Sequence, residues 1–251
     1  MVDAGGTAAV SAEAFRLIGT PRFGGILVVS DHASNHVPED IALGIAPALR
    51  EQHVAVDIGV GAVGELLARH AGFAAFQCGV SRLVCDVNRE DDAPAAVSAL
   101  SDGHVIPGNV LDHAARLARL ARFHEPYHAG LAQVLDAAPP ALIVSLHSFT
   151  PSLASRDEPR PWQVGVLYNT DDRAARLAIP LLEAEGLIVG DQQPYSGKLL
   201  NYTMNRHAEA EGRPYLGIEI RQDEIADPAG QERWAERLFR LCNAVALRVG
   251  D

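Results

Sequence analysis

Short apolar runs alternate along this chain with longer segments of helical periodicity, and this alternation limits the possible folds more than any other feature. The runs with the length and composition of buried strands are Gly25–Ser30, Ala141–Ser148, Trp162–Tyr168 and Tyr215–Ile220, with Val80–Val84 as a weaker candidate. Apolar residues recur at helical spacing in Val56–His70, Val110–Leu135, Asp171–Glu185 and Gln231–Val249. The pattern predicts an α/β fold with a central mixed, mostly parallel sheet flanked by helices.

The chain shows no linker, internal repeat or low-complexity segment. Its 251 residues suit one large domain with a well-buried core, so we predict a single domain over residues 1–251. No apolar stretch reaches the length of a membrane span, and the first residues lack the pattern of a signal peptide. The three cysteines fit neither a zinc ribbon nor a disulfide framework, which predicts free thiols and a cytoplasmic location.

The charge of the chain favours a small anionic partner. The net charge of −11 and the lack of any basic run argue against nucleic-acid binding. Lys198 is the single lysine beside 20 arginines, several of which adjoin polar motifs. Because the guanidinium fork matches a carboxylate, such arginines are candidates for binding an anionic substrate.

Polar clusters stand where the predicted strands end. Asp31 and His32 follow the first strand, His147 ends the central one, and Glu219 lies inside the late one. In open α/β sheets, ligands bind where strands pass into loops. We therefore expect the three clusters to meet in one crevice.

His32 and His147 are candidate metal ligands, because imidazole and carboxylate are the usual ligands of zinc in hydrolases. A helix-capping turn with a packed His32, and a hydrogen-bonded core His147, are the alternative interpretations. Glu219 has apolar neighbours on both sides, where an ionised carboxylate is costly without a cation, a metal or a raised pKa. These conditions are those of a general base. Alternatively, Glu219 points to solvent beside Arg221.

The segment that ends in Asp86-Val87-Asn88-Arg89 presents a carboxamide and a guanidinium together. Such a pair can hold a substrate carboxylate or polarise a carbonyl, although an exposed turn with an ion pair has the same pattern. Asp57 is a candidate helix cap, and Tyr195 is a candidate substrate contact in a turn.

His124 and His128 share a helix face at a spacing that can bind metal. Pro126 between them is expected to break or kink the helix. We therefore expect a substrate-facing or structural role for this pair.

Together these motifs resemble the N-formylglutamate amidohydrolase family, which is related to zinc carboxypeptidases and aspartoacylase. The resemblance extends from about residue 25 to residue 225 and is carried by Asp31–Asn35 with Pro38, Asp57 with Gly59, Ser81–Leu83, Asp86–Arg89, His124–His128, Leu146–Pro151, Pro194–Gly197 and Gly217–Arg221. It implies a zinc-carboxypeptidase-like (phosphorylase/hydrolase-like) fold.

In those relatives a His-x-x-Glu pair and a later histidine hold the metal, and a glutamate near the C-terminal end is the base. By resemblance, His32 and His147 are metal ligands and Glu219 is the base. Asn35 occupies the position of the carboxylate ligand, so it binds weakly or is replaced by Asp31 or Asp57.

The motifs and the resemblance together predict the remaining site residues. We expect Arg82 and Asn88 to join Glu219 in catalysis. Arg89, Arg221, Tyr195 and Asp57 are expected to bind the substrate.

The function implied is hydrolysis of an N-formyl (N-acyl) acidic amino acid such as N-formylglutamate, dependent on Zn²⁺ or another divalent metal. A peptidase or amidase acting on a cell-wall or peptide fragment is an alternative. A non-catalytic binder of small anions is another. The sequence makes no prediction of oligomeric state.

Overall fold

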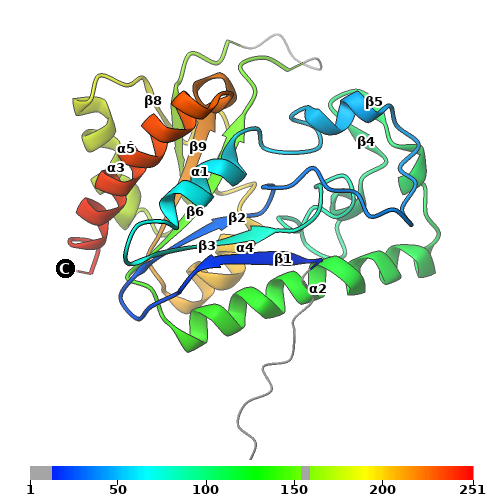
Figure 1. Ribbon diagram of the computed structural model, residues 1–251, viewed down its shortest axis with the longest axis horizontal. Coiled ribbons are helices and arrows are strands. Elements are labelled where there is room, and N and C mark those ends of the chain that lie inside the picture. The colour runs from blue at the N-terminus through cyan, green and yellow to red at the C-terminus, as the bar shows by residue number, and fades with distance from the viewer. Residues whose placement is uncertain (1–12, 154–158, 251) are drawn as a thin grey trace, which may run out of the picture.

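A twisted seven-stranded sheet lies at the centre of the computed structural model, which describes residues 13–153 and 159–250 (Figure 1). Its strands stand in the order β1-β3-β2-β6-β9-β7-β8. Their bounds are β1 (Phe15–Gly19), β2 (Ile26–Ser30), β3 (Phe73–Cys78), β6 (Leu142–Phe149), β7 (Val164–Leu167), β8 (Val189–Asp191) and β9 (Tyr215–Arg221). A short separate hairpin is formed by β4 (Leu100–Ser101) and β5 (His104–Val105).

The sheet is mixed and mostly parallel, as predicted. Strands β3, β2, β6 and β9 run parallel, whereas β1 and the β7–β8 pair run in the opposite direction. The carboxyl ends of β2, β6 and β9 therefore meet at one edge of the sheet. This edge is where ligands bind in open α/β folds.

The four main strand predictions are confirmed, but the weaker one at Val80–Val84 is wrong. This segment is a turn that is closed by a hydrogen bond from the Val84 amide to the Ser81 carbonyl, and its valines are buried in the core. Strands β1, β3 and β8 were not predicted. Strand β3 contains two alanines and a glutamine, and β1 is partly exposed, so neither has the β-branched apolar pattern of a buried strand.

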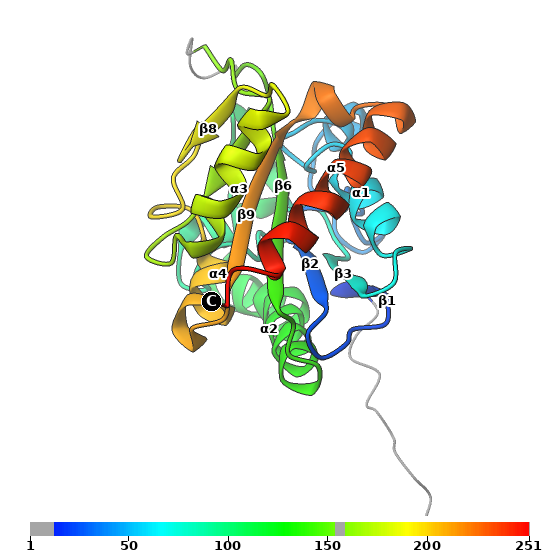
Figure 2. The ribbon, with the colours of Figure 1, turned by 90° about the vertical axis from the view of Figure 1, so that its left-hand side faces the viewer.

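Helices cover both faces of the sheet (Figure 2). On one face α5 packs against both α1 and α3, and α2 and α4 lie on the other face. Their bounds are α1 (Val60–Leu67), α2 (His113–Ala137), α3 (Arg173–Ala184), α4 (Tyr202–His207) and α5 (Pro228–Ala246). The four predicted helices are present with shifted ends, and the short α4 was not predicted.

Helix α2 continues through Pro126, so the expected break is absent. Proline removes one backbone hydrogen bond. The helix nevertheless buries a long apolar stripe that includes Phe123, Tyr127 and Leu131, each with no exposed surface. Burial of such large side chains contributes roughly 1.5–3 kcal/mol each, which offsets the lost hydrogen bond.

A second, smaller core lies apart from the main one and supports the loops on one side of the site. Its buried side chains are Leu43, Leu49, Val54, Ala55, Leu83 and Ile106. Cys78, Cys85 and Cys242 are buried, free thiols, as predicted. Across residues 13–153 and 159–250, none of the helices combines the length and apolar character of a membrane span.

Candidate metal centre and substrate pocket

Strand register brings the predicted polar clusters together. Parallel pairing of β6 with β9 places His147 directly beside Glu219, although the two are 72 positions apart in the chain. Asp31 and His32 follow β2, which is the other neighbour of β6. The expectation that the strand-end clusters meet in one crevice is therefore confirmed.

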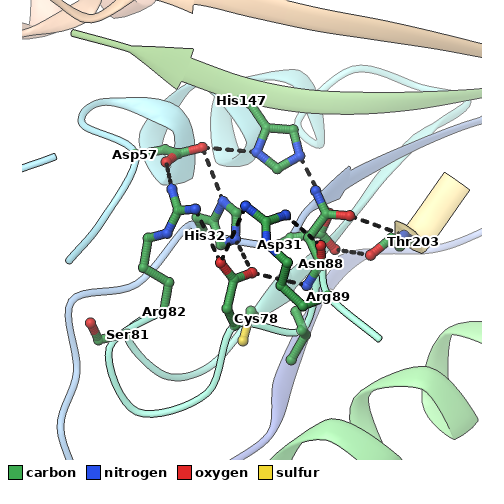
Figure 3. A network of polar contacts seen from close by, with 12 residues as sticks. Asp31, His32, Asp57, Cys78, Ser81, Arg82, Asn88, Arg89, His147 and Thr203 are labelled. Carbon is green, nitrogen blue, oxygen red and sulfur yellow. Dashed lines mark hydrogen bonds and ion pairs between the residues drawn. The ribbon is translucent and has the colours of Figure 1, made fainter. Parts of the chain in front are cut away.

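His32, Asp57 and His147 form a compact set of metal-binding side chains. Their ligand atoms all lie within 4.8 Å of one another, and the three residues are buried. Asp57 Oδ2 is 3.4 Å from His32 Nδ1 and 2.8 Å from His147 Nδ1. Figure 3 shows the three side chains pointing toward one another. The two histidines therefore present ring nitrogens close enough together to bind one ion.

Asp57 stands in a turn before α1 and does not cap that helix, which begins only at Val60. The Asp57 amide donates a hydrogen bond to the His32 carbonyl, which places the carboxylate beside both imidazoles. The turn requires Gly59, whose φ is +81° and whose missing side chain leaves room for the Ile225 carbonyl. A side chain at this position would displace the turn that carries Asp57.

Two further carboxylates face the outer nitrogens of the histidines. Asp86 Oδ1 accepts a hydrogen bond from His32 Nε2 at 2.8 Å, and Asp31 Oδ2 lies 3.3 Å from His147 Nε2. Asp31 itself accepts hydrogen bonds from the hydroxyls of Tyr127 and Thr203. Carboxylates in this position orient metal-ligating histidines and increase their basicity.

Charges within the cluster shift its pKa values. Burial opposes ionisation of Asp57, but His32 and His147 outweigh it and lower the pKa of Asp57. Burial also opposes protonation of His147, yet the neighbouring carboxylates of Asp31 and Asp57 raise the pKa of this imidazole well above its usual value. Both pKa shifts have the same cause: the ionised carboxylates and the protonated imidazoles of the cluster stabilise each other.

The cluster fits a divalent cation by its donor types and by its charge. His32 Nδ1, Asp31 Oδ2 and Glu219 Oε2 are buried and form no hydrogen bond with any residue that the structure describes. Four buried carboxylates, those of Asp31, Asp57, Asp86 and Glu219, surround the site. Arg82 and Arg89 are the guanidinium groups in the pocket lining, so two negative charges remain when all four carboxylates are ionised and both imidazoles are neutral. A metal ion with two positive charges neutralises this excess.

Glu219 lies at the edge of the metal cluster rather than within it. Its side chain is buried, and burial together with the charge of Asp57 raises the pKa of Glu219 to about 7, against the opposing effect of His147. A carboxylate with a raised pKa beside a metal site has the properties of a general base.

Asn35, which was expected as the third ligand, lies outside the His–Asp–His cluster. Its amide donates a hydrogen bond to Glu51 Oε1 at 2.9 Å in a partly exposed loop. The reason is the path of the chain, because the turn at Asp57 folds back onto His32 and fills the third position. Asp57, one of the two expected replacements, supplies the carboxylate.

A small polar pocket of about 170 Å³ opens onto these side chains. Its lining residues are His32, His53, Asp57, Arg82, Asn88, Arg89, His147, Ser148, Phe149, Thr150, Tyr195, Leu200 and Glu219. The set contains every predicted site residue except Asn35 and Arg221.

The comparisons with known proteins agree with this geometry. A family model described as N-formylglutamate amidohydrolase matches residues 24–226. The chain belongs to the N-formylglutamate amidohydrolase family. The metal cluster and Glu219 all lie inside the segment that matches this family.

Two solved structures resemble this family member over nearly their whole length. The gene product Atu2144 from Agrobacterium tumefaciens is 30% identical, with a TM-score of 0.88 and coverage of 98% of this chain and 99% of that one. The N-formylglutamate amidohydrolase from Ralstonia eutropha JMP134 is 22% identical, with a TM-score of 0.75 and coverage of 94% and 98%. No match was found among curated proteins. The second likeness supports the fold alone.

Arg221 does not reach the pocket of this N-formylglutamate amidohydrolase family member, so its expected place there is wrong. Its guanidinium forms a two-point ion pair with Asp223, at 2.7 and 3.0 Å, and contacts the Trp162 and Pro161 carbonyls. Side-chain alternation alone places Arg221 on the same face of β9 as Glu219, so the ion pair with Asp223, and not the alternation, draws its guanidinium away from the pocket. Glu219 faces the site, and Arg221, the last residue of the strand, finds a carboxylate two positions farther along the chain.

Sequence reasoning missed three polar residues of the pocket: Ser148, Thr150 and, farthest from any motif, His53. His53 lies near the small second core, and its Nε2 is 3.0 Å from Asp102 Oδ2. No strand end or motif marks His53 in the sequence. Its place in the pocket depends on the folding of two loops against each other.

Proposed function

We propose that this chain hydrolyses the amide bond of an N-formyl (N-acyl) acidic amino acid such as N-formylglutamate, releasing formate and the amino acid. The observation that carries the proposal is Glu219 beside a His–Asp–His cluster, in a pocket that also presents Arg89 and Asn88. Membership of the N-formylglutamate amidohydrolase family supports the same reaction.

His32, Asp57 and His147 would hold the metal, for which we propose zinc because two imidazoles and a carboxylate suit it. When bound, the metal polarises the amide carbonyl and makes a nearby water a stronger acid. Asp86 and Asp31 keep the two imidazoles oriented through their outer nitrogens.

Glu219 transfers a proton in the proposed reaction. Its carboxylate takes a proton from the attacking water as the oxygen bonds to the amide carbon. The same carboxyl group then donates that proton to the amine nitrogen as the carbon–nitrogen bond breaks. The burial of Glu219 limits competition from bulk water for this proton.

The two arginines of the pocket have different tasks. Arg82 is held between Asp57 and Asp86, at 3.3 and 3.1 Å, so we assign it to positioning the metal-site carboxylates. Arg89 is 4.0 Å from Asp86 and donates one hydrogen bond to the Asn88 carbonyl. Its other N–H groups are therefore available for a substrate carboxylate.

Arg89→Ala is expected to raise the KM for N-formylglutamate by about tenfold or more, with a smaller change in kcat. A carboxylate contact that is equally strong in the ground state and the transition state affects binding more than turnover. Steady-state kinetics with the purified variant measures both constants.

Arg221→Ala is the matched control, because this arginine is bound to Asp223 outside the pocket. Its KM is expected to stay within about twofold of wild type, as for a surface pair. An unchanged KM in Arg89→Ala would show that Arg89 does not bind the substrate carboxylate.

The proposed function is tested by a substrate panel. N-formylglutamate is compared with N-formylaspartate, N-formylalanine, N-acetylglutamate and a short γ-glutamyl peptide, with chelator and with added zinc. Fastest turnover of the formylated acidic amino acids, abolished by chelator and restored by zinc, supports the proposal. Preferred turnover of the peptide indicates the peptidase alternative. Binding of these anions without turnover of any of them indicates a non-catalytic binder.

A further inference from the structure

The loop Asp86–Arg89 is held by hydrogen bonds to each of its last three carbonyl groups. His128 Nε2 binds the Val87 carbonyl at 2.9 Å, and His124 Nε2 binds the Arg89 carbonyl at 2.8 Å. The carbonyl between them, that of Asn88, is bound by Nη1 of Arg89 at 2.7 Å. Two histidines one helical turn apart on α2 therefore hold the backbone on both sides of Asn88.

These contacts define where the protons lie. A carbonyl only accepts, so Nε2 of His124 and of His128 must each carry a proton. Neutral His128 then has an unprotonated Nδ1, which accepts a hydrogen bond from His207 Nε2 at 2.9 Å. Burial lowers the pKa of His128 to about 3 and that of His207 to about 4. Both rings are thus neutral near pH 7, which is the form that this chain of hydrogen bonds requires.

Helix α4 holds the same loop from a second side. The Thr203 amide donates to Asn88 Oδ1 at 3.0 Å, and the Asn88 amide donates to Asp86 Oδ1 at 3.1 Å. His207, at the other end of α4, completes the connection to α2 through His128. Figure 3 shows Asn88 and Arg89 between Thr203 and the metal cluster.

We propose that His124, His128 and His207 are positioning residues that hold Asn88 and Arg89 where they meet the substrate. This inference rests on the proposed function, in which Arg89 binds the substrate and Asn88 lines the same pocket. The histidines do not touch the pocket; they act through the backbone of the loop. A backbone displacement of about 1 Å in such a loop is enough to weaken the contacts that these residues make with the substrate.

The contrary view is that these histidines only fill space between α2 and the loop. An apolar side chain of similar size would then replace them without a specific effect on the substrate. The hydrogen bonds argue against this view, since removal of a donor leaves a buried carbonyl without a partner.

The test compares His124→Leu, which removes the donor, with His124→Gln, which can place an N–H near the position of Nε2. His124→Leu is expected to raise the KM for N-formylglutamate by about tenfold, with kcat changed less than about threefold and zinc content unchanged. The kcat/KM ratio of N-formylglutamate to N-formylalanine should fall. In His124→Gln, the KM for N-formylglutamate and the kcat/KM ratio of the two substrates should both lie within about twofold of wild type.

His128→Gln and His128→Asn form a second pair if His124→Leu does not fold. Glutamine places its amide near Nε2, whereas asparagine places it near Nδ1, so only the asparagine variant should show the raised KM. His70→Leu, which changes a partly exposed histidine stacked on Phe239, is the control for loss of an imidazole.

The positioning role would be overturned if His124→Leu and His124→Gln lost kcat/KM to the same extent, and if each lost it equally for N-formylglutamate and N-formylalanine. Crystal structures of the two His124 variants separate this inference from the proposed function. If wild type does not hydrolyse N-formylglutamate, the proposed function fails, and the crystal structures alone decide the inference. Displacement of the Asn88 backbone in His124→Leu but not in His124→Gln supports it, and an unmoved loop in both contradicts it.

Discussion

Glu219→Gln is expected to reduce kcat by at least about 100-fold while the fold and the metal content are kept. Glutamine has nearly the same size as glutamate, but its carboxamide cannot take a proton from water near pH 7. The side chain lies beside His147 in the β6–β9 pairing and outside the His–Asp–His set, so its loss leaves all three proposed metal ligands in place. The removal of one buried negative charge should also leave the stability unchanged or slightly raised, because burial raises the pKa of Glu219.

The measurement is single-turnover and steady-state hydrolysis of N-formylglutamate, with zinc quantified in the same protein sample. Glu224→Gln is the matched control, since Glu224 lies a few residues farther along the same segment and does not line the pocket. Its turnover should stay close to wild type. Near wild-type turnover in Glu219→Gln, with zinc present, would show that another group is the base.

Asp57→Asn is expected to weaken zinc binding by at least about 100-fold and to abolish turnover at trace zinc. A neutral carboxamide oxygen is a poor zinc ligand, and the substitution removes the negative charge that both His32 and His147 face. Because a metal that binds only the folded state stabilises it, zinc should raise the Tm of wild type much more than that of Asp57→Asn.

Metal content after dialysis and Tm with and without zinc provide two readouts that do not depend on activity. Asn35→Ala is the control that separates the sequence-based assignment from the structural one, because Asn35 bonds Glu51 outside the cluster. It should bind zinc as wild type does. Loss of zinc in Asn35→Ala with retention in Asp57→Asn would mean that the chain around His32 adopts a different conformation when metal is bound.

The residues at strand ends were predictable from the sequence. His32, His147 and Glu219 stand in or directly after runs of β-branched apolar residues, and such runs identify buried strands. Parallel strands have their carboxyl ends at the same edge of the sheet. A mostly parallel sheet therefore implies that these side chains lie near one another. The prediction succeeded there because it depended only on short-range pattern and on sheet geometry.

Loop residues were less predictable. Asp57 rather than Asn35 completes the cluster because a turn that needs Gly59 folds back onto His32. His53 reaches the pocket through contacts between two distant loops. The spacing of residues along the chain does not predict these positions. The conformation of a loop depends on the tertiary contacts that provide hydrogen-bond partners for its backbone.

The sequence by itself indicated the fold class, the family, both histidines of the cluster and the buried carboxylate, because periodicity and strand-end position are local properties. Only the tertiary structure showed that Asp57 is the third member of the cluster and that the arginines have different surroundings. Arg221 and Arg89 look equivalent in the sequence, since each follows a motif residue. Arg221 is neutralised by Asp223, whereas Arg89 keeps free donors in the pocket. Which carboxylate an arginine meets depends on where the backbone places both partners, and short-range sequence patterns do not specify that geometry.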